Sequence, residues 1–492
     1  MPRILAIGIL RAFVLCCAAG ICLAANGAAP KLPARTGHAS VRVLMVSDIH
    51  FDPFWDPGKA AQLAAAPESA WAAILGGAAS PDRGERFAAL QKSCHAKGTD
   101  TDYALFQSTL HAMQTQAARA AFVTVGGDLL AHDFSCEFYS VAPHATAAGY
   151  EAFAANTFDF VLERLRAALP GVPVYSALGN NDSGCGDYRL DAGGVFLRAI
   201  APSLSADLPE HERGPARREI ARNGSYSAML PPPMGRTRLL VIDDVFSSNN
   251  YATCGGKPDA SPAAEQIAWL RSRLAKARRE HEKVWVMGHI PPGIDPFSTI
   301  RKMANVCAGG PPAMFLRSDT FANIVAEFGD VVRLAVFAHT HMDELRLLKA
   351  EKAGAHGGAV AVKMVPSISP WRGNKPSFVV AAVDPASAIL KDYRVIAASN
   401  VTAVAAEWNQ EYDFDRAYGD TEFSPDSLKR TIAGFRADPG AKTAASREYL
   451  RNYYTGDLSP LLKPFWPEYT CALANDTAEG FRSCACGSGQ KP

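Results

Sequence analysis

Short apolar runs rich in β-branched residues recur along most of the 492-residue chain, and polar or amphipathic stretches separate them. Runs of this length and composition are typical of buried strands. They predict strands at residues 41–47, 121–125, 172–177, 238–243, 283–287, 332–337, 360–365, 377–383 and 389–395.

Helical periodicity fills several gaps between these strands. It occurs at residues 104–118, 152–169 and 261–280, and an Ala-rich insertion at residues 57–100 is expected to be helical in part. In the last helix Ser261 is expected to act as the cap, and Pro262 suits the first turn. Strands that alternate with helices predict parallel βαβ units, and the consecutive strands after residue 360 predict a second sheet packed on the first. The expected fold class is therefore α/β (α+β).

The two ends of the chain depart from this pattern. Arg3 precedes an apolar run at residues 12–25, which predicts a signal peptide over residues 1–25, followed by a linker over residues 26–40. An uncleaved membrane anchor is the alternative, although Arg11 leaves the apolar run short for a membrane span. The main domain is expected at residues 41–398, and residues 399–492 are expected to form a helical, aromatic-rich, cysteine-containing subdomain.

The chain has eleven cysteines, of which eight lie beyond the predicted signal peptide. An even number behind a signal peptide predicts disulfides in an oxidising compartment, so a periplasmic or secreted protein is expected. Cys471 is expected to pair with Cys484 or Cys486, and the other pairings stay open. The rival interpretation, a zinc cluster at Cys484 and Cys486, is disfavoured because no second cysteine pair lies nearby.

Charge gives little guidance to a partner. The formal net charge is +1, and charged residues make up 20% of the chain without a long block of one sign. Neither a nucleic acid nor an acidic membrane surface is therefore expected as a partner. No segment beyond the predicted signal is long and apolar enough to predict stable membrane insertion.

Metal-capable side chains follow several of the predicted strands. In chain order they are Asp48, His50, Asp128, Asn180, His289, His339 and His341. The carboxyl ends of strands meet at one edge of a sheet, where open α/β folds hold their sites. Each short motif alone is a weak signal, but the whole set in this order favours one shared metal site.

This set of motifs resembles that of the calcineurin-like metallophosphoesterases. Residues 131–133 (Ala-His-Asp) and 366–370 (Pro-Ser-Ile-Ser-Pro) are similar to motifs of the acid sphingomyelinase-like branch. The resemblance implies a four-layer sandwich of two mixed sheets flanked by helices, and a metal-dependent phosphoric ester hydrolase. It also implies two divalent metal ions, with zinc as the first choice and iron or manganese as alternatives.

The resemblance also implies a role for each ligand. Asp128 is expected to bridge the two ions, while Asp48, His50 and His341 complete the first set and Asn180, His289 and His339 the second. Two such metals lower the pKa of a bridging water, and the resulting hydroxide attacks phosphorus.

One position departs from the family's pattern. Asn181 occupies the place of a histidine that contacts the phosphoryl group in the family. As a candidate catalytic residue, its amide can donate a hydrogen bond to a phosphoryl oxygen, but it cannot supply a proton at neutral pH. His132 is therefore the candidate for leaving-group acid or phosphate donor, and Asp133 is a candidate to hold its ring. The alternative is that His132 only orients a metal ligand.

These residues predict a secreted or periplasmic phosphodiesterase of the acid sphingomyelinase-like type. The linker is too short for a lipid-extracting module, so a soluble or partly soluble phosphoester is the expected substrate. Two alternatives stay open. One is a phosphomonoesterase or polyphosphatase of the same fold, and the other is a metal- and phosphate-binding protein with impaired catalysis.

Overall fold

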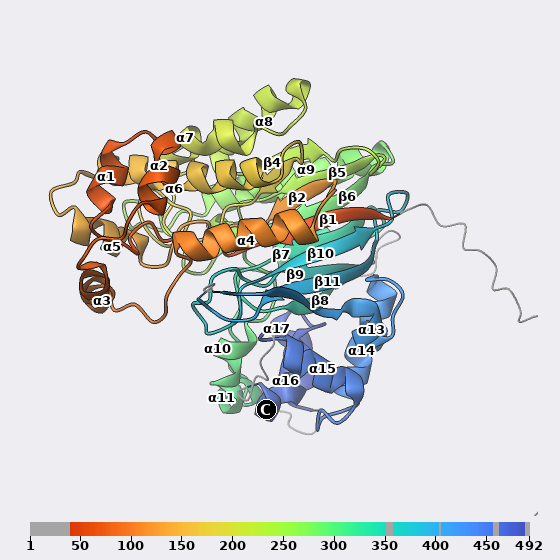
Figure 1. Ribbon diagram of the computed structural model, residues 1–492. Coiled ribbons are helices and arrows are strands. Elements are labelled where there is room, and N and C mark those ends of the chain that lie inside the picture. The colour runs from red at the N-terminus through yellow and green to blue at the C-terminus, as the bar shows by residue number, and fades with distance from the viewer. Residues whose placement is uncertain (1–39, 351–357, 403–404, 456–461, 488–492) are drawn as a thin grey trace, which may run out of the picture. The chain divides into compact units, whose positions relative to one another are not determined.

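Two six-stranded mixed sheets, flanked by helices, form the centre of the structure (Figure 1). The computed structural model describes residues 40–350, 358–402, 405–455 and 462–487. The predicted signal peptide and residues 26–39 of the predicted linker lie outside these residues. The predicted fold class, with two mixed sheets, flanking helices and a helical C-terminal region, is confirmed.

The first sheet has the strand order β12-β11-β10-β1-β2-β3. Its strands are β1 (Val41–Val46), β2 (Phe122–Val125), β3 (Val174–Ser176), β10 (Ser377–Val383), β11 (Leu390–Ala398) and β12 (Trp408–Asp413). β1, β2 and β3 are parallel, and β10, β11 and β12 add to them as antiparallel neighbours. β12 was not predicted as a strand, because it lies in the aromatic-rich stretch that was expected to be helical. The predicted boundary at residue 398 remains a prediction.

The second sheet has the order β4-β5-β6-β7-β9-β8. Its strands are β4 (Tyr226–Met229), β5 (Thr237–Val241), β6 (Lys283–Met287), β7 (Val332–Phe337), β8 (Glu344–Lys349) and β9 (Ala359–Met364). The sequence did not predict the two edge strands. β4 is short, and β8 contains Glu344 and Arg346, which interrupt its apolar pattern but lie buried as an ion pair at 3.0 Å.

The two sheets pack face to face through apolar side chains. The ring of Phe122 on β2 lies 5.7 Å from that of Trp285 on β6, and the Trp285 indole donates a hydrogen bond to the Ala388 carbonyl at 2.9 Å. Helices cover the outer faces, so the central strands are buried on both sides. This burial accounts for the nearly continuous apolar runs in the sequence.

Helices precede and connect the strands. They are α1 (Ala60–Ala65), α2 (Trp71–Gly76), α3 (Arg83–Ser93), α4 (Tyr103–Gln116), α5 (Phe134–Val141), α6 (Ala147–Ala168), α7 (Val195–Leu204), α8 (Glu210–Asn223), α9 (Ser261–Arg279), α10 (Pro296–Ile300), α11 (Met303–Cys307) and α12 (Thr320–Glu327). α6 begins earlier than predicted because the Thr146 side chain caps it, accepting from the Gly149 N–H. The predicted cap of α9 is wrong: Ser261 is its first helical residue, and Asp259 accepts the Ser261 N–H at 2.9 Å.

The C-terminal region continues from β12 as a group of helices around an aromatic core. These are α13 (Phe414–Tyr418), α14 (Pro425–Arg436), α15 (Ala444–Asn452), α16 (Trp466–Ala472) and α17 (Ala478–Ala485). The rings of Phe435, Tyr449 and Trp466 lie 5.1–5.6 Å from one another.

All eight cysteines beyond residue 25 form disulfides. The pairs are Cys94–Cys136, Cys185–Cys254, Cys307–Cys486 and Cys471–Cys484. The predicted local pairing of Cys471 is confirmed. A zinc cluster at Cys484 and Cys486 is excluded, because both thiols are used in disulfides.

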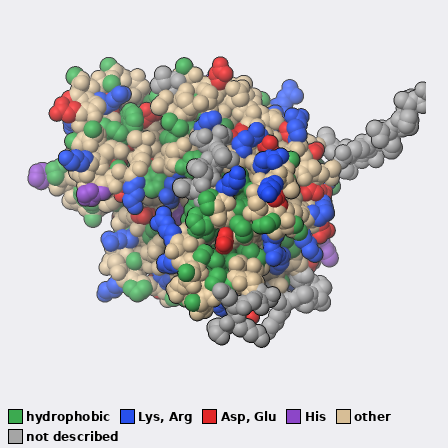
Figure 2. All heavy atoms as spheres, turned by 90° about the horizontal axis from the view of Figure 1, so that it is seen from below, with side chains coloured by type: hydrophobic (Ala, Val, Ile, Leu, Met, Phe, Trp, Pro, Cys, Tyr) green, Lys and Arg blue, Asp and Glu red, His purple; other side chains and the backbone are tan. Residues whose placement is uncertain are grey.

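On the face drawn in Figure 2, several basic side chains lie near one another at the upper right, and others are scattered between hydrophobic and polar ones. Among the residues that the structure describes, no helix is both long and apolar enough to cross a bilayer.

Candidate metal centre

The loops that follow β1, β2, β3, β6 and β7 carry the seven predicted metal ligands and bring them together. Two backbone hydrogen bonds join the first pair of loops: the Asp48 N–H donates to the Gly127 carbonyl at 3.1 Å, and the His50 N–H donates to the Asp128 carbonyl at 2.9 Å. The parallel order of β1 and β2 therefore continues past the strand ends and sets the spacing of the ligands.

Five of these ligands have left-handed backbone conformations. Their φ angles are 46° at Asp48, 44° at His50, 54° at Asp128, 71° at His339 and 66° at His341. Such angles are uncommon for residues other than glycine, and strained residues cluster at functional sites because the surrounding structure holds them.

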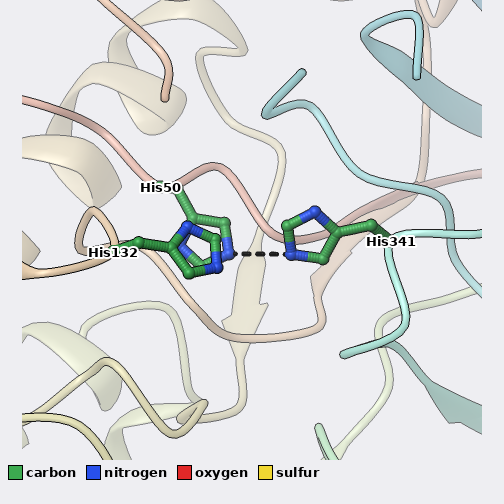
Figure 3. Close-up of side chains that lie close together, drawn as sticks. All are labelled: His50, His132 and His341. Atoms are coloured by element: carbon green, nitrogen blue, oxygen red, sulfur yellow. Dashed lines mark hydrogen bonds between the residues drawn. The ribbon is translucent and has the colours of Figure 1, made fainter. Parts of the chain in front are cut away.

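The first set of ligands lies around Asp48. The Nε2 atoms of His50 and His341 are 3.1 Å apart, and they lie 3.8 Å and 3.6 Å from Asp48 Oδ1 (Figure 3). Asp128 Oδ2 lies 3.5 Å from His50 Nε2. These four side chains therefore aim donor atoms at one small volume.

The second set shares Asp128 with the first. Asp128 Oδ2 lies 3.2 Å from His289 Nε2, which is 3.2 Å from Asn180 Oδ1 and 3.2 Å from His339 Nδ1. One carboxylate oxygen thus approaches both histidine sets, which is the arrangement that a bridging ligand requires.

Hydrogen bonds fix the tautomers of two histidines. His50 Nδ1 donates to the Leu130 carbonyl at 2.9 Å, and His289 Nδ1 donates to the Gly126 carbonyl at 2.8 Å. A carbonyl can only accept, so each Nδ1 carries a hydrogen, and in the neutral form of each ring the lone pair lies on Nε2, toward the centre.

The residues fit divalent metal ions. Both Asp48 carboxylate oxygens are buried without a hydrogen-bond partner among the described residues, and an isolated buried carboxylate is costly without a cation. Burial lowers the pKa of His50 to about 4 and that of His339 to about 3, so both rings are neutral ligands at neutral pH. Burial also lowers the pKa of His289, but the charge and hydrogen bond of Asp128 outweigh it and raise the pKa to about 10, as expected where uncompensated carboxylates attract positive charge.

Asn181 faces Asp128. Its backbone N–H donates to Asp128 Oδ1 at 2.8 Å, and its side-chain amide donates to Asp128 Oδ2 at 2.9 Å. Gly179 makes this close approach possible, because a Cβ at that position would overlap the Asp128 carboxylate. The amide is thus placed to orient the shared carboxylate.

His132 lies at the edge of the first set. Its Nδ1 lies 3.1 Å from Asp100 Oδ1, and its ring stacks on that of His50 with centroids 3.9 Å apart. The suggestion that Asp133 holds this ring is wrong, because Asp133 is exposed and Asp100 is the hydrogen-bond partner. His132 also lies close enough to His50 and His341 for these three rings to share an ion.

Three supporting residues were not predicted. Asp187 accepts from the Asn180 amide at 2.7 Å, the Tyr188 hydroxyl lies 3.3 Å from His339 Nε2, and Asp244 accepts from the His289 N–H at 2.9 Å. They contact candidate ligands from segments without a recognisable motif, so only the folded chain identifies them.

A cavity of about 620 Å³ opens beside His132. Asn181, Trp371, Tyr139 and Lys97 are among the residues that line it. The space is large enough for an organic group attached to a phosphate.

The sequence is similar to those of known phosphoesterases. A sequence model of the calcineurin-like phosphoesterase family matches residues 41–343. Acid sphingomyelinase-like phosphodiesterase 3b of Homo sapiens is 23% identical over 80% of this chain and 82% of its own length. The cyclic GMP-AMP phosphodiesterase SMPDL3A of Rattus norvegicus is 23% identical over 72% of this chain and 74% of its own. A solved dimetal phosphatase from Danio rerio aligns with 76% of this chain and 100% of its own, at 10% identity and a TM-score of 0.39.

The family match covers more than half of the chain and includes the loops that carry all seven candidate ligands. The chain belongs to the calcineurin-like phosphoesterase family, and it resembles the acid sphingomyelinase-like phosphodiesterases within it.

Proposed function

We propose that this protein is a two-metal phosphodiesterase, exported to the periplasm or secreted, that acts on soluble or partly soluble phosphodiesters. The observation that carries the proposal is the position of Asp128 Oδ2, 3.5 Å from His50 Nε2 in one set and 3.2 Å from His289 Nε2 in the other. When bound, two divalent ions would lower the pKa of a bound water and neutralise charge on the phosphoryl oxygens.

The ligand sets suit this chemistry. Asp48, His50 and His341 would hold one ion with Asp128, and Asn180, His289 and His339 would hold the other with the same Asp128. Neutral imidazoles, carboxylates and one amide oxygen suit zinc best, and iron or manganese are the alternatives.

His132 is the proposed leaving-group acid. Asp100 occupies its Nδ1, so Nε2 is the atom left to donate a proton to the leaving oxygen. Asn181 cannot supply that proton, and its two hydrogen bonds to Asp128 support a role in orienting the shared carboxylate.

The cavity of about 620 Å³ beside His132 offers room for an organic leaving group, which diesters and monoesters both carry. The names of the related phosphodiesterases favour a diester over a monoester as the substrate. Four disulfides and the predicted signal peptide support export to an oxidising compartment.

The test compares hydrolysis of bis(p-nitrophenyl) phosphate with that of p-nitrophenyl phosphate, which share a leaving group. We expect kcat/KM for the diester to be about tenfold or more above that for the monoester. Asp128→Asn should abolish diester turnover, and the exposed control Asp82→Asn should leave it unchanged. Turnover of the monoester alone would favour the phosphatase alternative, and metal binding without turnover would favour the binding protein.

A further inference from the structure

We propose that Trp371 is a positioning residue for His132, holding the imidazole so that its Nε2 faces the leaving group. This inference rests on the proposed function. Trp371 lies in the loop after β9, and it was not among the residues that the sequence singled out.

Trp371 completes a stack of planar groups that begins inside the metal centre. The His50 and His132 rings are 3.9 Å apart at 21°, and the His132 and Trp371 rings are 4.2 Å apart at 12°. The Arg372 guanidinium lies 4.6 Å from the centroid of the Trp371 ring. Figure 3 shows the rings of His50 and His132 overlapping, with both facing His341. His132 is thus held on both faces.

The same loop also fixes the edge of His132. The Ser369 hydroxyl donates to Asp100 Oδ1 at 2.6 Å, and the Trp371 N–H donates to the Ser369 hydroxyl oxygen at 3.2 Å. Asp100 in turn holds His132 Nδ1. The segment from Ser369 to Trp371 therefore restrains the imidazole twice. Trp371 packs on its face, and Ser369 holds Asp100, which bonds its Nδ1 edge.

The position of Trp371 argues against a purely structural role. The indole is only partly buried and lines the cavity beside His132, whereas a tryptophan that serves the core, such as Trp285, is fully buried. Without the indole, the face of His132 turned away from His50 would open to this cavity and the ring could leave its orientation. Catalysis by a positioned acid depends on that orientation.

The test uses two diesters that differ in their need for an acid, methyl phenyl phosphate and methyl p-nitrophenyl phosphate. We expect Trp371→Leu to lower kcat about 10- to 100-fold on the phenyl ester and less than about threefold on the nitrophenyl ester. Trp371→Phe should restore most of the loss, because it keeps an aromatic face. Trp55→Leu is the matched control: Trp55 is also partly buried beside an arginine, Arg83, and should not change either rate.

A double variant separates positioning from general damage. Trp371→Leu combined with His132→Gln should be no slower than His132→Gln alone, since the indole acts through the imidazole. Metal content should equal that of the wild type. Equal loss on both esters, an effect on KM alone, or a further loss in the double variant would overturn the inference. A wild type that turns over neither diester would refute the proposed function instead, and crystal structures of the wild type and Trp371→Leu would then decide whether His132 has kept its orientation.

Discussion

Asp48 in the candidate metal centre fits a cation because its buried carboxylate lacks hydrogen-bond partners. Asp48 is fully buried, and neither of its carboxylate oxygens has a hydrogen-bond partner among the described residues. Burial raises its pKa to about 7, which shows how unfavourable the bare carboxylate is in that position. The neutral imidazoles beside it offer lone pairs and no compensating charge. A metal ion would compensate the charge of the Asp48 carboxylate and accept the lone pairs of the imidazoles.

Glu137 on α5 provides a pH test away from the metal ligands. It is 2% exposed, and burial, followed by the charges of Asp52, Asp100 and Asp133, raises its pKa from 4.5 to about 10. A raised pKa means that the folded protein binds this proton more tightly than the unfolded chain. The stabilisation is fully present below pH 4.5 and is lost as the pH rises toward 10.

Replacing Glu137 should therefore reduce the loss of stability at high pH. Relative to Glu137→Gln, the wild type should lose about 1–3 kcal/mol of unfolding free energy between pH 5 and pH 9. Urea denaturation of both proteins across this range measures the difference, with the exposed Glu85→Gln as control. A difference that does not change with pH would contradict this assignment.

The candidate metal ligands, and their convergence at one place, could be predicted from the sequence because each follows an apolar strand and belongs to a motif. Asp100 and Trp371 could not, because nothing local distinguishes them and each acts through His132 from a distant segment. Asp133 was a reasonable candidate to hold the His132 ring, because it is the nearest carboxylate in the chain. Its backbone is left-handed, with φ of 54°, just before α5, and the residue is exposed.

At the scale of elements, a disulfide restrains the loop after β3 that supports the second set of candidate ligands. Cys185 and Cys254 join the loop after β3 to a segment that precedes α9. That loop contains Asp187, which orients Asn180, and Tyr188, which lies 3.3 Å from His339. The disulfide thus restrains the supports of the second ligand set.

Removing this disulfide should weaken metal binding as well as the fold. We expect Cys185→Ser with Cys254→Ser to lose about 2–4 kcal/mol of stability and about tenfold or more in affinity for one of two ions. Cys471→Ser with Cys484→Ser, which lies in the C-terminal helices, should lose stability but keep the metal affinity. Competition with a chelator measures the metal affinity of both double variants. Equal metal affinity in the two double variants would show that the loop does not support the site.

Strand prediction succeeded where burial was continuous and failed at β4, β8 and β12. The central strands read as apolar runs because helices cover their outer faces. β8 was missed because Glu344 and Arg346 neutralise each other only in the folded state, and β12 was missed because its aromatic residues resemble those of the helices that follow it.

The C-terminal region and the metal centre are joined through buried polar contacts at the scale of the whole molecule. The Tyr412 hydroxyl of β12 donates to Asp343 Oδ2 at 2.5 Å, and the Asp343 N–H donates to the Tyr453 carbonyl at 3.2 Å. Asp343 follows the ligand His341 by two residues, and it also pairs with the buried Lys363. The C-terminal region therefore contributes to holding the loop that carries the candidate ligand His341.

Tyr412→Phe tests this connection. Removing the hydroxyl leaves a buried carboxylate with one fewer hydrogen bond, so the unfolding free energy should fall by about 1–3 kcal/mol. Tyr103→Phe is the control, since the Tyr103 side chain is buried and its hydroxyl has no hydrogen-bond partner in the part of the chain that the structure describes. Chemical denaturation compares the two, and equal stabilities would contradict a role for the Tyr412 hydroxyl.

In the proposed function one carboxylate, that of Asp128, joins two metal sites, and elemental analysis of the purified protein tests this most directly. The wild type should contain about two divalent ions per chain. Asp128→Asn should retain about one or fewer, because the amide that replaces the shared carboxylate carries no charge. A wild type that binds no metal after loading with zinc, iron or manganese, or an Asp128→Asn variant that keeps both ions, would contradict the claim.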